Sequence, residues 1–177
     1  MKYFVANSEN LPFENEQFDS VLGNLVLMLA DNYENILKET YRLLKPGGIA
    51  GFTIWGRKDK CNNWTIYGEN LSAYNIPFPG DKSPFALHFQ LEKVKETFAS
   101  IGFKNLRVDY TTLVADTYNS EDFHSKFKNT FVELSIEKAE EDNVTKYLEA
   151  VNEIVKARVD GTDTLTTLDV CVLIAFK

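Results

Sequence analysis

The stretch FDSVLGNLVLMLADNYENILKETYRLLKPGGIAGFTIW, residues 18–55, decides the fold of this 177-residue chain. Residues 18–28 are strongly apolar, and their first part is typical of a fully buried strand in a parallel sheet. Residues 33–44 carry apolar side chains at helical spacing, and residues 49–55 are apolar and partly β-branched, which is typical of a second strand. The stretch therefore predicts a βαβ unit, whose connection is right-handed in nearly all proteins.

The expected helix has a recognisable start and end. Asp31 is followed three residues later by Glu34, which predicts a capping box with Asp31 as the N-cap. Pro46 cannot continue a helix, and the glycines that follow it favour a turn. We therefore expect the helix to stop at residues 45–48 and the next strand to begin at Ile49.

Further elements are expected on both sides of this unit. Residues 2–6 are a short strand candidate, and residues 56–83 are irregular with a short helix around 64–73. Helices are predicted at 91–100, at 120–133 and from Asp142 onward, and strands are predicted at 103–114 and 164–176.

Composition excludes several classes of partner. The net charge is −7 and the sequence pI is about 4.9, whereas nucleic-acid binders usually carry a basic face. An acidic chain is also repelled by acidic membrane surfaces. The two cysteines, Cys61 and Cys171, give neither a disulfide framework nor metal-ligand spacing. We expect no nucleic acid, no membrane and no metal, and a cytoplasmic or other reducing, soluble compartment.

Three segments resemble one known family. Residues 6–13, ANSENLPF, resemble the A-D-A-E-x-L-P-F signature of class I S-adenosylmethionine-dependent methyltransferases. Residues 18–21, FDSV, resemble the F-D-x-V opening of the family's next strand, and residues 41–48, YRLLKPGG, resemble its R-x-L-K-P-G-G turn. In this order and spacing, the three segments are similar to the type 11 methyltransferases.

The resemblance implies an α/β fold with a Rossmann-like, mostly parallel sheet and an antiparallel C-terminal strand. It also implies S-adenosylmethionine as the cofactor and a small molecule as the methyl acceptor. The family's glycine-rich segment, D/E-x-G-x-G-x-G, does not occur in residues 1–177. We therefore expect a single, N-terminally truncated domain, with a cofactor-side remnant (1–55), a substrate or lid loop (56–90) and a C-terminal part (91–177).

The same resemblance places four residues at the cofactor. Asn7 stands where the family usually has an Asp that accepts from the adenine amino group, and Ser8 would offer its backbone N–H to the ring. Gly23 and Asn24 end the first long strand, where the family meets the methionine part of the cofactor. The alternative interpretations are a simple turn for Asn7 and Ser8, and a strand-to-loop transition for Gly23 and Asn24.

Five side chains fall where related enzymes hold the methyl acceptor: Trp55, Trp64, Tyr67, Phe85 and His88. His88 is a candidate general base, because a histidine can exchange a proton near neutral pH. The alternative is that the aromatic side chains only pack and that His88 is structural or exposed. No catalytic residue beyond this candidate is predicted.

Two functions remain open from the sequence. The chain is either part of a small-molecule methyltransferase, or a methyltransferase-like structural subunit of a larger complex that has lost catalysis. In the family's sheet, the absent first strand would lie beside residues 19–25. We therefore expect an open strand edge at Asp19–Leu25 that pairs with a protein partner or with a second copy of the chain.

Overall fold

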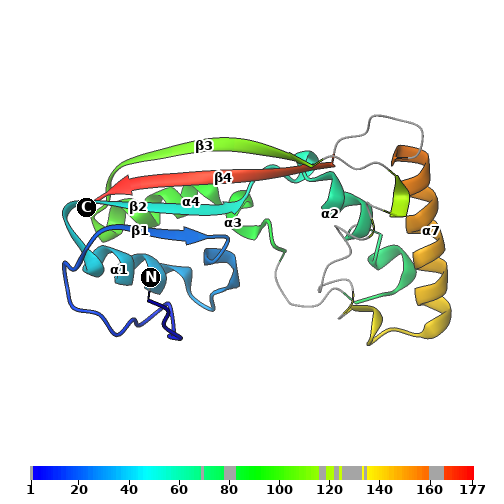
Figure 1. Ribbon diagram of the computed structural model, residues 1–177, viewed down its shortest axis with the longest axis horizontal. Coiled ribbons are helices and arrows are strands. Elements are labelled where there is room, and N and C mark those ends of the chain that lie inside the picture. The colour runs from blue at the N-terminus through cyan, green and yellow to red at the C-terminus, as the bar shows by residue number, and fades with distance from the viewer. Residues whose placement is uncertain are drawn as a thin grey trace. The chain divides into compact units, whose positions relative to one another are not determined.

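The computed structural model describes residues 2–68, 70–77, 83–115, 119–121, 124, 133, 135–159 and 166–177. The chain has an α/β fold whose elements follow one another as shown in Figure 1. They are β1 (Phe18–Asn24), η1 (Leu27–Leu29), α1 (Tyr33–Leu43), β2 (Leu44–Trp55), η2 (Lys58–Lys60), α2 (Asn62–Tyr67), η3 (Ser72–Tyr74), α3 (Ala86–Phe89), α4 (Leu91–Ile101), β3 (Lys104–Ala115), α7 (Glu141–Val159) and β4 (Thr166–Phe176).

The chain divides into two compact units. The first contains Met1–Arg57, Pro84–Thr111 and Val170–Lys177, and the second contains Lys58–Ser83 and Thr112–Asp169. The predicted division of one partial domain into residues 1–55, 56–90 and 91–177 stays a prediction. The expected helix at 120–133 falls mainly outside the described residues.

The strands that the structure describes form one sheet in the order β1-β2-β4-β3. β1 and β2 are parallel, as the βαβ pattern predicts, and β4 runs antiparallel to β2. The antiparallel C-terminal strand is therefore confirmed. It lies between β2 and β3, where Figure 1 shows it in red.

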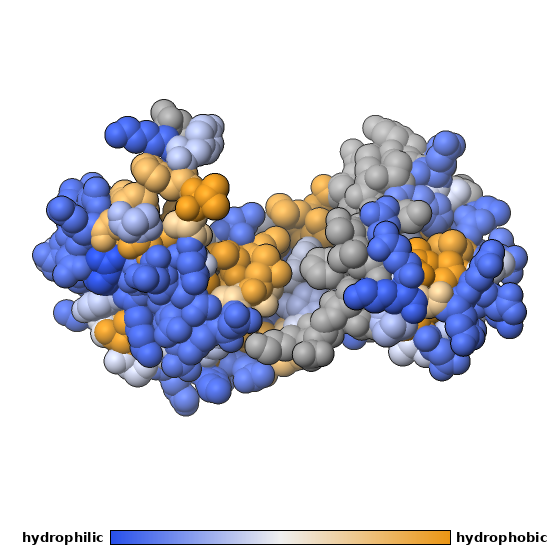
Figure 2. All heavy atoms as spheres, turned by 90° about the horizontal axis from the view of Figure 1, so that it is seen from below, coloured by the Kyte–Doolittle hydropathy of each residue, from blue (hydrophilic) through white to orange (hydrophobic). Residues whose placement is uncertain are grey.

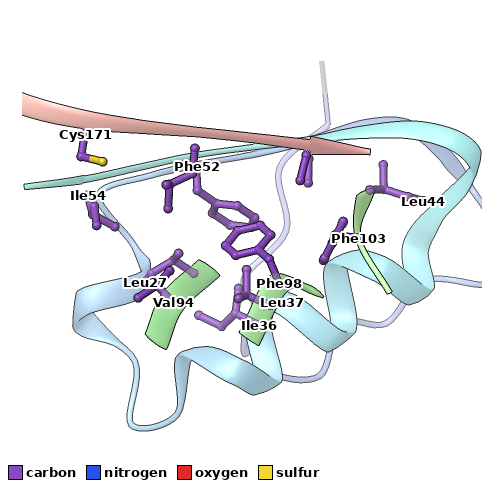
Figure 3. Close-up of a cluster of buried hydrophobic side chains, with 13 residues drawn as sticks. Leu27, Ile36, Leu37, Leu44, Phe52, Ile54, Val94, Phe98, Phe103 and Cys171 are labelled. Atoms are coloured by element: carbon purple, nitrogen blue, oxygen red, sulfur yellow. The ribbon is translucent and has the colours of Figure 1, made fainter. Parts of the chain in front are cut away.

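Helices α1 and α4 pack on one face of this sheet. Alternate β2 side chains, Ala50, Phe52 and Ile54, are buried against them in the main core. Figure 3 shows the rings of Phe52 and Phe98 meeting between the sheet and the helices. The predicted helix at 91–100 is confirmed as α4, which ends at Gly102 in a left-handed conformation with φ of 110°.

Two expected boundaries are wrong. The N-cap of α1 is Asn32, not Asp31, because the Asn32 side chain accepts a hydrogen bond from the N–H of Glu34 at 3.0 Å. β2 begins at Leu44 rather than Ile49, because the backbone at Leu44 already pairs with Phe18 of β1 directly after α1. The Leu44 side chain is buried. The glycine and proline residues 46–48 therefore lie within an irregular part of β2, where the register with β1 shifts.

Three further expectations are corrected. Residues 2–6 form no strand and are exposed, and none of the described strands pairs with them. The first strand is not fully buried, because it is the end strand of the sheet and Leu22 is 80% exposed. The short helix expected around 64–73 lies earlier, at Asn62–Tyr67.

The second unit has its own core. Tyr67 of α2 and Tyr147, Val151 and Val155 of α7 are buried together with Ile66, Leu71 and Ile76. The Tyr147 hydroxyl donates to the backbone oxygen of Tyr67 at 3.0 Å. None of the helices in the described ranges has both the length and the apolar character needed to cross a lipid bilayer.

Candidate functional site

The turn at residues 7–10 is closed by the hydrogen bonds of Asn7. Its Oδ1 accepts from the backbone N–H of Glu9 at 2.9 Å, and its carbonyl oxygen accepts from the N–H of Asn10 at 3.0 Å. A side-chain oxygen that accepts from the backbone two residues later makes an Asx turn. Asn7 is exposed and Ser8 is half-buried, so the expected turn is present and the contact with adenine stays a prediction.

Glu9 ties this turn to the first turn of α1. One carboxylate oxygen accepts from the N–H of Asn32 at 3.2 Å and the other from Nδ2 of Asn35 at 2.9 Å. These hydrogen bonds lower the pKa of Glu9, and the hydrogen bond from Asn35 has the largest effect. The candidate adenine-binding turn is thus held at the N-terminus of the helix that follows β1.

The end of β1 is fixed by one hydroxyl of β2. The Thr53 hydroxyl donates to Oδ1 of Asn24 at 2.6 Å and accepts from the N–H of Leu25 at 2.9 Å. Leu25 has a positive φ of 51°, so the chain turns sharply away from the sheet here. The side-chain oxygen of Asn24 accepts from Thr53, and the side-chain nitrogen is the donor of this amide.

Gly23 lies directly on the core. A Cβ atom at this position would be 2.5 Å from Cε1 of Phe52 and 2.9 Å from Cγ1 of Val26. A side chain of any size is therefore excluded without a shift of the core. The absence of a side chain at Gly23 lets the backbone of the strand end lie against Phe52.

Two aromatic rings, those of Phe89 and Tyr110, lie beside His88 in the first unit. Nε2 of His88 lies 3.0 Å from the hydroxyl of Tyr110, and the Arg57 guanidinium lies over the Tyr110 ring at 4.8 Å from its centroid. The ring centroids of Trp55 and Phe85 are 6.0 Å apart. The structure therefore brings Trp55 and Phe85 together. Phe85 directly precedes α3, the short helix that carries His88.

Trp64 and Tyr67, the other predicted acceptor-side residues, belong to the second unit. Tyr67 is buried, its hydroxyl is hydrogen-bonded to Nδ1 of His124, and burial raises its pKa to about 12. Nε2 of His124 in turn lies 3.3 Å from Oδ1 of Asn152. Tyr67 therefore packs and hydrogen-bonds inside its own unit, as the packing alternative expects.

Sequence reasoning missed Thr53 and Tyr110 as neighbours of the predicted residues. Thr53 is the residue that pairs with Asn24 across the two parallel strands. Alternation along β2 could have put it on the same face as Asn24, but only the register decides that pairing. No pattern in the sequence links Tyr110 to His88. Within the described residues, no three His, Cys, Asp or Glu side chains are placed to hold a metal ion.

The first part of the chain matches a known family. Residues 1–52 match the model of the family described as "Methyltransferase domain". An uncharacterized protein of Methanocaldococcus jannaschii is 32% identical over 114 residues, which cover 63% of this chain and 50% of that protein. The malonyl-(acyl-carrier protein) O-methyltransferase of Enterobacter lignolyticus is 39% identical over 51 residues, covering 29% of this chain and 20% of that protein.

The chain spans at most half the length of these two curated relatives. Among solved structures, the MccD protein shares the fold with a TM-score of 0.54 and 19% identity, covering 99% of this chain and 67% of that one. The likeness of fold thus extends over nearly all of this chain, whereas the match to the family model is confined to residues 1–52.

Proposed function

Because residues 1–52 match the methyltransferase domain model, we propose that the chain is a class I S-adenosylmethionine-dependent methyltransferase and that it binds S-adenosylmethionine at the carboxyl end of β1. The observation that carries this proposal is the arrangement of the family-matched segment. The turn at Asn7 and Ser8 and the strand end at Gly23 and Asn24 are each fixed by specific hydrogen bonds. In open α/β sheets, ligands bind at the carboxyl ends of the strands.

Each of the four residues has a role in this proposal. The Ser8 backbone N–H and the remaining polar atoms of Asn7 face the adenine ring. The exposed amide nitrogen of Asn24 donates to the carboxylate of the methionine part, and Gly23 lets that part approach the backbone. Hydrogen bonds to a charged group contribute about 1.5–3 kcal/mol and neutral ones about 0.5–1.5 kcal/mol, so Asn24 has the larger expected effect.

The reaction we propose is methyl transfer to a small molecule. When bound, S-adenosylmethionine supplies an electrophilic methyl group on a sulfonium sulfur. The chain holds the acceptor in line with that group, and proximity and alignment supply much of the rate. His88, beside Tyr110, is the candidate that takes the proton from the acceptor.

Calorimetric titration of the full chain with S-adenosylmethionine and S-adenosylhomocysteine tests the proposal. From the hydrogen-bond energies above, Asn24→Ala is expected to raise the dissociation constant at least ten-fold. Asn7→Ala is expected to raise it about two- to ten-fold. Asn143→Ala, in the second unit, is the matched control and should leave it unchanged. Equal effects of all three substitutions, or no binding by the wild type, would contradict the proposed site.

The second candidate function is a structural subunit that has lost catalysis. It is the alternative that the sequence leaves open, and cofactor binding is the measurement that decides between the two functions. On this proposal the chain alone cannot bind the cofactor fully. Binding only after addition of a second polypeptide with a D/E-x-G-x-G-x-G segment would indicate a split enzyme, and no binding in either case would favour the structural role.

We also propose that the edge of β1, at Asp19–Leu25, pairs with a strand of another chain. β1 is the end strand of the sheet, and an end strand presents unpaired backbone groups. Apolar side chains continue over the sheet face opposite α1 and α4. The register pairs Leu22 with Gly51, Gly51 with Ile174 and Ile49 with Phe176, so these side chains share one face.

This face is accessible in the described chain. Leu22, Ile49 and Phe176 are 80%, 40% and 37% exposed. Figure 2 shows one side of the molecule, on which hydrophobic residues lie among mostly hydrophilic ones. We propose that the partner is a second copy of this chain and that Leu22 lies at the contact. Leu22→Lys is expected to shift the mass measured by light scattering toward the monomer. Leu113→Lys, at a side chain that is 52% exposed on β3, should not. A wild-type chain that stays monomeric at all accessible concentrations would contradict self-association.

A further inference from the structure

Two charged residues lie where α1 meets the loop at residues 11–16. Glu39 is only 9% exposed and sits among the buried residues of α1. Arg42, one turn later, donates to it twice, from Nε to Oε2 at 2.9 Å and from Nη2 to Oε1 at 2.6 Å. Such a bidentate pair fixes both side chains in one geometry.

Both residues of the pair also form hydrogen bonds with the loop. Oε1 of Glu39 accepts from the N–H of Leu11 at 2.8 Å. Nη1 of Arg42 donates to the carbonyl oxygen of Phe13 at 2.9 Å and to Oδ1 of Asn15 at 2.7 Å, and Nη2 donates to the carbonyl oxygen of Leu11 at 3.3 Å. Residues 11–16 belong to no helix or strand, so the loop takes its position from these contacts with α1.

The backbone adds one further link at the end of the loop. The N–H of Glu16 donates to the carbonyl oxygen of Arg42 at 2.9 Å. At the beginning of the loop, Glu9 is bound to Asn32 and Asn35, and its own N–H holds the side chain of Asn7. Helix α1 therefore holds the segment at residues 7–16 at two places, its first turn and its last turn.

We infer that Glu39 and Arg42 are positioning residues for the turn at Asn7 and Ser8. This inference rests on the proposed function, because the turn matters for affinity only if it contacts the cofactor. The pair does not touch the ligand. It fixes residues 11–16, and so limits the positions that the preceding residues 7–10 can adopt. A binding turn that is already ordered loses less conformational entropy when the ligand arrives.

An ordinary stabilising ion pair would behave differently from a positioning pair. Its removal would lower the stability of the fold without changing the affinity of the folded chain. The ion pair Glu92–Lys95 of α4 has the same i,i+3 spacing, with a distance of 2.7 Å, and an exposed Glu92 side chain. It is the matched control, because none of its described contacts reaches the loop.

The experiment compares Arg42→Lys and Glu92→Gln in the full chain. Lysine keeps the charge of Arg42 but cannot form its bidentate, branched hydrogen bonds. Two quantities are measured at a temperature where each variant is folded by circular dichroism. One is amide hydrogen exchange at residues 8–16 without ligand, and the other is the dissociation constant for S-adenosylhomocysteine. Arg42→Lys is expected to speed exchange at Leu11 and Glu16 and to weaken binding at least five-fold, and Glu92→Gln to change neither.

The double variant Glu39→Arg with Arg42→Glu separates the two roles further. It restores an ion pair within α1, but it places a cation at the N–H of Leu11, which needs an acceptor. We expect stability to recover in part and binding to stay weak. Faster exchange in Arg42→Lys with an unchanged dissociation constant would overturn the positioning role and leave the proposed function intact. No binding by the wild type would overturn the proposed function and, with it, this inference.

Discussion

Replacing Gly23 by alanine tests how closely the end of β1 lies against the core. The new Cβ would be 2.5 and 2.6 Å from two ring carbons of Phe52 and 2.9 Å from Val26. Carbon atoms attract best at about 3.5–4.0 Å, so the overlap is about 1 Å. Phe52 is 2% exposed and packs edge-on against Phe98 with centroids 6.2 Å apart, so the ring cannot move aside without disturbing its neighbour.

The expected cost follows from two opposing terms. Overpacking of a close-packed core costs about 1–3 kcal/mol, and alanine is preferred to glycine inside a strand by about 0.5–1 kcal/mol. A net destabilisation of about 1–2 kcal/mol results. Gly51→Ala is the matched control on the neighbouring strand. Its Cβ meets only Cδ2 of Leu22, at 2.7 Å, and that side chain is 80% exposed and free to rotate.

Urea unfolding followed by tryptophan fluorescence measures both variants. The chain has two tryptophans, so a Trp64→Phe background leaves Trp55 as the reporter of the first unit. With an m-value of about 2 kcal/mol/M, the midpoint of Gly23→Ala should fall by about 0.5–1 M, and that of Gly51→Ala should change by less than about 0.3 M. Equal midpoints for the two variants would refute the reasoning, because the two clashes would then cost the same.

Three more predictions follow from single residues. Glu39 has a pKa lowered first by the hydrogen bond from Arg42. The stability that it contributes is present above its unfolded pKa, near 4.5, and is lost as pH falls through the folded value, so Glu39→Gln should flatten the acid side of a plot of Tm against pH. Burial raises the pKa of Tyr67 to about 12. The stability that the neutral phenol contributes is therefore present below its unfolded pKa of 10 and is lost between pH 10 and about 12. Tyr67→Phe should reduce that alkaline loss in thermal melts, and an unchanged loss would argue against the burial of the phenol. Gly102→Ala should destabilise by about 1–2 kcal/mol, because φ at this helix end is 110°, and a thermal melt equal to that of the wild type would contradict this.

The sequence predicts the βαβ unit and the antiparallel C-terminal strand well. Periodicity identifies α1 and α4, because an amphipathic helix must bury one stripe of side chains. Boundaries fail where a single local contact decides them. The side chain of Asn32 rather than Asp31 reaches the N–H of Glu34. The backbone of β2 pairs with β1 from Leu44 onward, before the glycines.

In the candidate site, too, the sequence indicates individual residues but not the residues that surround them. The residues Asn7, Ser8, Gly23 and Asn24 are proposed from the resemblance to the family, because motifs are local in the chain. Their surroundings are not found in this way, since the partner of Asn24 is Thr53, 29 residues later. The loop at 11–16 is held by the side chains of Glu39 and Arg42, which lie 27 to 31 residues from the atoms that they bind.

Residues 18–55 by themselves determine the order of strand, helix and strand, because hydrophobic spacing and turn chemistry act between near neighbours. Only the tertiary structure decides that β1 is the end strand, with Leu22 exposed. The same apolar run would be buried if another strand lay beside it. Burial depends on which strands pair across the sheet, and pairing between distant segments leaves no fixed spacing in the sequence.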